Sequence, residues 1–116
     1  MPTAIPTIGC LLTIALGALG LVAPHRTARL VGIHPLGADG TAEVRATYGG
    51  LFLGLGTAAL LWAEPVGYAV AAAAWGGAAA ARLLSLMAPP VEVRRQLLGL
   101  GLEAGIAAML AAGVRW

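Results

Sequence analysis

The chain has 116 residues, of which 59% are hydrophobic and only 10% are charged. A water-soluble domain needs roughly 25% charged residues to cover its surface, so this composition excludes an ordinary soluble protein and indicates a surface that faces lipid. The net charge of +2 is too small and too scattered for a nucleic-acid-binding protein.

Four apolar stretches each approach the ~20 residues that an α-helix needs to cross ~30 Å of hydrocarbon. No stretch alternates apolar with polar residues, and the Ala and Leu runs favour helix. Short links make successive helices neighbours. The sequence therefore predicts one all-α domain over residues 1–116, an integral membrane up-down four-helix bundle, with helices at about 5–23, 41–63, 66–88 and 97–114. Pro24, Glu64-Pro65 and Pro89-Pro90 end the first three helices.

The first helix and the link after it carry few chemical signals. The N-terminus has no basic region of the kind that precedes a cleaved signal, so we expect this helix to remain as a membrane anchor. Cys10 is expected to be a small buried apolar residue. Within the link, residues 25–33 are expected to form a short amphipathic turn on the membrane surface. His25 and His34 in this link have no third ligand at a standard spacing, so we predict neither a metal site nor a cofactor.

The positions of Arg predict the orientation of the helices, because positively charged links stay on the cytoplasmic side. The two termini and the link at 64–65 contain only Arg115, whereas the other links and the adjoining helix entry contain Arg26, Arg29, Arg45, Arg94 and Arg95. We therefore expect both termini outside. The aromatic residues that agree, by falling at the outer interface, are Trp62, Tyr68 and Trp116.

Small residues recur at helical spacing on several helices. Gly50, Gly54 and Ala58 fall on one face of the second helix, and Gly101 and Gly105 are four apart in the last. Such faces let helix backbones approach closely, which favours packing in lipid. We expect Gly50 and Gly54 to touch a neighbouring helix of the bundle. A homo-oligomer interface through either glycine pair is the alternative.

Arg82 and Glu103 are ionisable residues within apolar helices, where each charge is costly and marks either pairing or function. The link between their helices is centred between Glu92 and Val93, and the two residues are equidistant from that centre. In an antiparallel hairpin they therefore lie at the same depth, about 10 Å inside the boundary at 1.5 Å per residue. The sequence predicts that they form a charge pair.

Further polar residues are expected at a similar depth, in the first turns of the second helix and beside Arg82. The charges of two Arg and two Glu would then balance, as buried charges require. These four residues are Arg45, Arg82, Glu43 and Glu103. The candidates for a general acid or base are Glu103 and Glu43. The candidates for binding polar groups of a substrate are Arg82, Arg45, Tyr48, Ser85 and Trp75, although a plain packing role for Trp75 is the favoured alternative.

These residues carry a resemblance to a known family. It rests on Glu43, Arg45, Gly49 and Gly50, on the stretch Arg82-Leu83-Leu84-Ser85-Leu86, and on Glu103 in the last helix. The sequence resembles a bacterial family of small four-helix membrane proteins that is catalogued as a domain of unknown function and is distantly DoxX-like. The resemblance spans nearly the whole chain and implies the same fold, a place in the bacterial cytoplasmic (inner) membrane, and no particular activity.

Two classes of function fit the sequence. The first is a non-enzymatic membrane component, either an assembly partner or a binder of a hydrophobic small molecule, because no nucleophile–base pair is evident. The second is a membrane-embedded isomerase or hydrolase of a lipid, terpenoid or quinone that uses a buried Glu as general acid or base. An Arg at the same depth would keep that Glu charged, so the first class is favoured.

Overall fold

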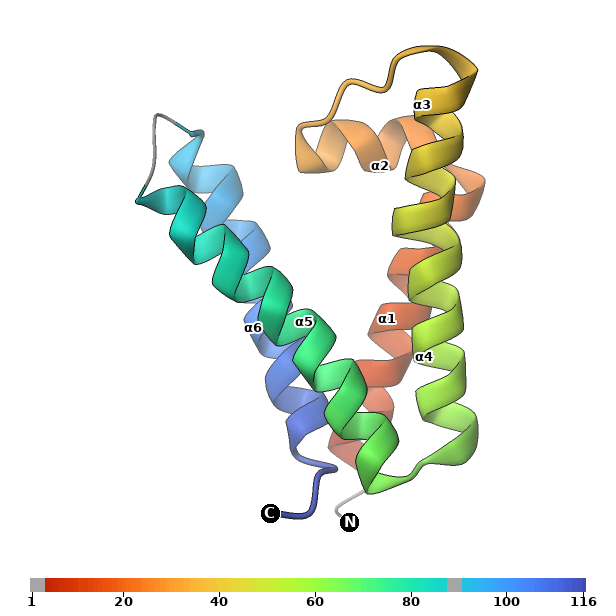
Figure 1. Ribbon diagram of the computed structural model, residues 1–116, viewed down its shortest axis with the longest axis vertical. Coiled ribbons are helices and arrows are strands. Elements are labelled where there is room, and N and C mark those ends of the chain that lie inside the picture. Colours follow the sequence, from red (N-terminus) through yellow and green to blue (C-terminus); the bar gives the residue numbers. More distant parts are fainter. Residues whose placement is uncertain (1–3, 88–90) are drawn as a thin grey trace. The chain divides into compact units, whose positions relative to one another are not determined.

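A computed structural model describes residues 4–87 and 91–116, and these residues are almost entirely helical, with no strand among them (Figure 1). The elements are α1 (Ala4–Val22), α2 (Pro24–Val31), α3 (Gly37–Val44), the π-helical turn η1 (Arg45–Gly50), α4 (Leu51–Trp62), α5 (Pro65–Leu86) and α6 (Val93–Ala111). The predicted helix end at residue 88 and the Pro89-Pro90 stop lie outside the described residues. The all-helical class that the sequence predicts is confirmed.

The chain divides into two compact units. Residues Cys10–Leu61 form the N-terminal unit, which holds most of α1 together with α2, α3, η1 and α4. Residues Met1–Gly9 and Trp62–Trp116 form the hairpin unit, which contains α5 and α6.

In the N-terminal unit, α3, η1 and α4 run on as one helix from Gly37 to Trp62, which packs against α1. This helix begins in a sequence, Gly-Ala-Asp-Gly, that reads as a loop. Asp39 lies in its first turn, where a carboxylate is favourable to the helix dipole. The Thr41 hydroxyl donates a hydrogen bond to the Gly37 carbonyl at 3.1 Å.

The contact between α1 and this long helix depends on glycine. A Cβ added at Gly17 would lie 2.6 Å from the backbone nitrogen of Leu53, and one at Gly20 would overlap the carbonyl group of Tyr48. From the other side, a Cβ at Gly49 would lie 2.9 Å from the backbone nitrogen of Leu21. These helices therefore approach more closely than any side chain would permit. Cys10 is fully buried in α1, as expected.

The expectation that Gly50 and Gly54 touch a neighbouring helix is wrong within this unit. Gly54 has no described atom of its own unit within 4 Å of an added Cβ, and the atom nearest to such a Cβ at Gly50 is the Arg45 carbonyl oxygen of its own helix at 3.9 Å. The packed face instead carries Gly49 and Gly56. Both faces of this helix are lined by small residues, so their spacing could not identify the one that meets α1.

The hairpin unit is an antiparallel pair in which α5 and α6 pack along their lengths (Figure 1). The buried side of α5 carries residues three and four apart, namely Tyr68, Ala71, Trp75 and Ala79. The buried side of α6 carries Glu103, Ile106 and Leu110. This spacing places one face of each helix in the contact, and Glu103 is the charged residue within it.

Three helices are long and apolar enough to cross a membrane: Ala4–Val22, Gly37–Trp62 and Pro65–Leu86. Large apolar side chains are exposed on all of them, among them Leu11, Leu51, Leu61, Val66 and Leu84. The helix α6 is not one of the three. It begins at Val93 rather than at 97 and so includes Arg94 and Arg95 as well as Glu103.

Candidate functional site

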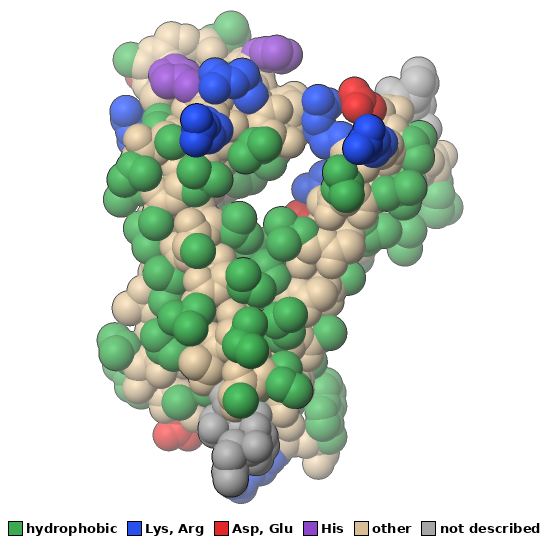
Figure 2. Space-filling model, turned by 180° about the vertical axis from the view of Figure 1, so that it is seen from behind, with side chains coloured by type: hydrophobic (Ala, Val, Ile, Leu, Met, Phe, Trp, Pro, Cys, Tyr) green, Lys and Arg blue, Asp and Glu red, His purple; other side chains and the backbone are tan. Residues whose placement is uncertain are grey.

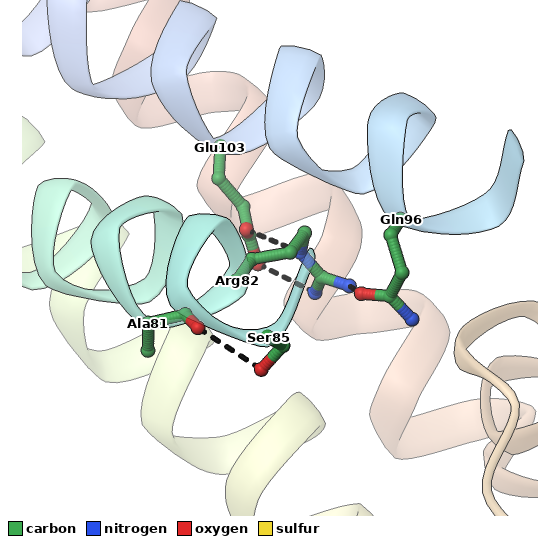
Figure 3. A network of polar contacts seen from close by, with 5 residues as sticks. All are labelled: Ala81, Arg82, Ser85, Gln96 and Glu103. Atoms are coloured by element: carbon green, nitrogen blue, oxygen red, sulfur yellow. Dashed lines mark hydrogen bonds and ion pairs between the residues drawn. The ribbon is translucent and has the colours of Figure 1, made fainter. Parts of the chain in front are cut away.

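Arg82 of α5 and Glu103 of α6 form the charge pair that the sequence predicts (Figure 3). The guanidinium Nε donates to the carboxylate Oε1 at 2.7 Å, and Nη2 donates to Oε2 at 2.9 Å. Two parallel charge-assisted hydrogen bonds of this kind are stronger and more directional than a single contact between charges. The prediction of this pair, which was based on the equal separation of both residues from the centre of the link, is confirmed.

A third residue completes the cluster. The remaining terminal nitrogen of Arg82, Nη1, donates to the side-chain oxygen of Gln96 at 2.8 Å. Gln96 lies seven residues before Glu103, two turns along the same face of α6, so one guanidinium bridges both side chains (Figure 3). Sequence reasoning missed Gln96. Residues three and four apart lie on the same face of a helix, so counting back seven residues from Glu103 would have identified Gln96.

Gly99 lies between these two partners and makes room for the guanidinium. A Cβ at Gly99 would lie 2.8 Å from both Cζ and Nε of Arg82. The flat guanidinium therefore rests on the bare backbone of α6. Gln96, Gly99 and Glu103 together form a seat for Arg82, which we call the arginine seat.

The arginine seat is largely shielded. The Glu103 side chain is 12% exposed and that of Arg82 is 23% exposed. Both carboxylate oxygens are bound by the same guanidinium, so a substrate would have to displace Arg82 to reach them.

The other candidates on α5 lie away from this seat. The Ser85 hydroxyl donates to the Ala81 carbonyl of its own helix at 3.0 Å and is exposed, pointing away from Glu103 (Figure 3). Trp75 is buried on α5, two turns before Arg82. Its position agrees with the packing role.

Glu43, Arg45 and Tyr48 belong to the N-terminal unit, where they lie in and beside the π-helical turn. Glu43 and Arg45 are exposed, and no hydrogen bond or ion pair joins them. The Tyr48 ring packs edge-on against Phe52, with 5.9 Å between ring centroids. Short π-helical segments are rare and are found often at functional sites. The structure brings Arg82 and Glu103 together, and it describes Glu43 and Arg45 only within the other unit.

The residues that the structure describes contain no group of three or more His, Cys, Asp or Glu placed to hold a metal ion. His25 and His34 are both exposed.

The sequence matches the model of a protein family described as "Domain of unknown function (DUF4345)" over residues 3–113. No curated protein and no solved structure matches the chain. The family match covers every helix and the whole arginine seat, and its description assigns no activity to them.

Proposed function

The chain belongs to the DUF4345 family of unknown function, and we propose that it is a non-enzymatic component of a membrane that it crosses four times. The observation that carries the proposal is the arginine seat, in which Glu103, the one buried carboxylate among the described residues, is held at both oxygens by Arg82. This arrangement suits a contact that joins two helices in lipid. It does not suit a carboxylate that must exchange protons with a substrate.

Three helices qualify as spans by length and composition, and α6 is the proposed fourth. Its Arg94 and Arg95 lie in the first turn, where long side chains can reach the membrane surface. Its remaining charge, Glu103, is neutralised by Arg82 of the adjacent span. With α6 inserted, the distribution of Arg favours both termini outside, and the resemblance supports a bacterial cytoplasmic membrane and a distant DoxX-like relationship.

The role proposed for this bundle is assembly with another membrane-embedded partner, and a second copy of the chain is the simplest one. Gly54, Gly101 and Gly105 have no described atom of their own unit within 4 Å of an added Cβ. In lipid, such bare stretches allow another helix to approach closely. A hydrophobic small molecule against the same faces is the other form that this non-enzymatic role can take.

The test exchanges the charge pair for apolar residues in living cells. Arg82→Met together with Glu103→Leu preserves volume and leaves no unpaired ion. The double variant is expressed in cells that lack the chromosomal gene, and these cells are grown in competition with wild-type cells. At equal amounts of protein in the membrane, the double variant should restore growth to the wild-type rate. Glu103→Gln alone serves as the matched single variant.

The outcome separates the two classes of function. A double variant that accumulates normally but fails to restore growth would make Glu103 a catalytic or ligand-binding carboxylate and overturn the proposal. Glu43→Gln provides the same test for the other candidate acid, because Glu43 is exposed and its loss should not affect folding.

A further inference from the structure

The helix α2 lies crosswise to the long helices of the N-terminal unit (Figure 1). Only Ala23 separates it from the end of α1, and five residues lie between the end of α2 and the start of α3. If α1 and the long helix cross the membrane, as proposed above, then α2 must lie in the plane of the membrane surface. The segment from Pro24 to Leu36 is therefore placed at the depth of the lipid headgroups.

The two faces of α2 differ sharply. Pro24, Thr27 and Ala28 are buried against the rest of the unit. The opposite face exposes a basic group consisting of His25, Arg26 and Arg29. Arg and His side chains gather at this end of the unit (Figure 2).

Arg26 and Arg29 make no ion pair with any residue in the described ranges. The ion pairs found there are those of Arg82 with Glu103 and of Arg95 with Glu92. The acidic residues of the adjoining α3, Asp39 and Glu43, are exposed and are not partners of either Arg. Both guanidinium groups are thus available to anions outside the chain.

Large apolar side chains accompany these charges. Leu30 is 62% exposed and Leu36 is 86% exposed, with Ile33 between them. Gly32, in the left-handed conformation at φ 77°, ends α2 and turns the chain at this point. Exposed apolar residues next to basic ones, on a short helix parallel to the surface, are typical of interfacial helices that bind lipid.

We propose that the segment Pro24–Leu36 binds anionic phospholipid headgroups, with Arg26 and Arg29 contacting the phosphates and with Leu30 and Leu36 reaching the acyl-chain boundary. The inference rests on the proposed membrane insertion and adds to it a lipid class and the residues that select it. A free phosphate ion would satisfy the Arg residues alone. The exposed Leu residues favour the phosphate of a lipid.

The test uses the full-length protein in maltoside micelles, titrated with dioleoyl-phosphatidylglycerol or with dioleoyl-phosphatidylcholine, and counts bound lipids by native mass spectrometry. The wild type should retain phosphatidylglycerol in preference to phosphatidylcholine. Arg26→Gln with Arg29→Gln should weaken the binding of phosphatidylglycerol roughly twenty-five-fold, since each basic residue near an anionic surface contributes about a factor of five. The control, Arg115→Gln, removes an Arg from the opposite side of the proposed membrane and should leave the preference intact.

Three results would overturn the inference: no preference in the wild type, an equal loss in the control, or displacement of phosphatidylglycerol by millimolar inorganic phosphate. The last would identify a free-anion site instead. Replacing Leu30 and Leu36 by Ser should weaken the binding of both lipids, and unchanged binding would argue against the apolar contact. Extraction of cell membranes with alkaline carbonate tests the insertion independently. A wild-type protein that washes off refutes the proposed function, whereas a retained protein without a lipid preference refutes only this inference.

Discussion

Removing either charge of the arginine seat should destabilise the protein far more than removing both together. Arg82→Met leaves a carboxylate that is 12% exposed without its two hydrogen-bond donors from Arg82, and Glu103→Leu leaves the guanidinium without its carboxylate partner. Breaking a fully buried pair from one side costs about 3–5 kcal/mol. Since Arg82 is 23% exposed and the pair is not fully buried, each single loss should be about 2.5 kcal/mol, somewhat below that range.

The double variant should lose only about 2 kcal/mol, because two apolar side chains of similar volume leave no ion unpaired. The coupling energy between the two positions is then about 3 kcal/mol, which is large for a double-mutant cycle. At about 4 °C per kcal/mol for a chain of this size, the single variants should melt roughly 10 °C below the wild type. The decrease in melting temperature of the double variant should be smaller than the sum of the decreases of the two single variants.

The assay measures the melting temperatures of the wild type, the two single variants and the double variant in a mild detergent. Unfolding of the same four proteins by a denaturing detergent gives their free energies of unfolding. Ser85→Ala is the control on the same turn, because its hydroxyl donates only to its own helix and its loss should cost little. Single losses that add to the double loss within about 0.5 kcal/mol would mean that the two side chains do not interact. That result would refute the structural role of the pair and would make Glu103 a candidate for a catalytic role again.

Three further predictions concern the glycines and the topology. Gly99→Ala should lower the melting temperature because its Cβ would lie 2.8 Å from Cζ of Arg82; the loss should disappear in an Arg82→Met background, and Gly77→Ala, in open space, should be neutral or stabilise by up to about 1 kcal/mol. Gly17→Ala should cost about 1–3 kcal/mol because its Cβ meets the backbone of the facing helix; a loss no larger than that of Gly77→Ala would contradict the packing described for α1. A periplasm-specific reporter fused after Trp116 should be active, and activity of a cytoplasm-specific reporter there would reverse the proposed orientation.

Two kinds of feature could be predicted from the sequence: the long helices, from the length of the apolar runs, and the charge pair, from the equal separation of its residues from the centre of the link. Apolar runs of about twenty residues fix the long helices, because only helices satisfy the backbone in lipid. The position of Glu103 relative to Arg82 follows from counting along two antiparallel helices of equal rise. The bidentate geometry then follows from the shape of the guanidinium.

Other features depend on choices that the sequence leaves open. The long helix has two small-residue faces, one with Gly49 and Gly56 and one with Gly50 and Gly54. Only the fit against α1, where Gly49 meets Gly20 and Leu21 and Gly56 meets Cys10 and Ile14, selects the first face. The seat residues Gln96 and Gly99 were missed because an amide and a glycine in an apolar helix carry no signal until their partner is placed. The change to π-helical hydrogen bonding at Arg45–Gly50 has no sequence marker that we can identify.

In the proposed four-span topology, the arginine seat would also allow a helix as polar as α6 to lie in the membrane. A single Glu or Arg at the centre of a span costs about 2.5–3.5 kcal/mol on insertion scales, and α6 carries Glu103 while α5 carries Arg82. Inserted separately, each helix bears its own penalty. Inserted as a hairpin, they share two hydrogen bonds between opposite charges, and the third guanidinium nitrogen, Nη1, donates to Gln96. In the proposed topology α5 and α6 are therefore one unit of insertion, because the charge of each helix is neutralised only by the other.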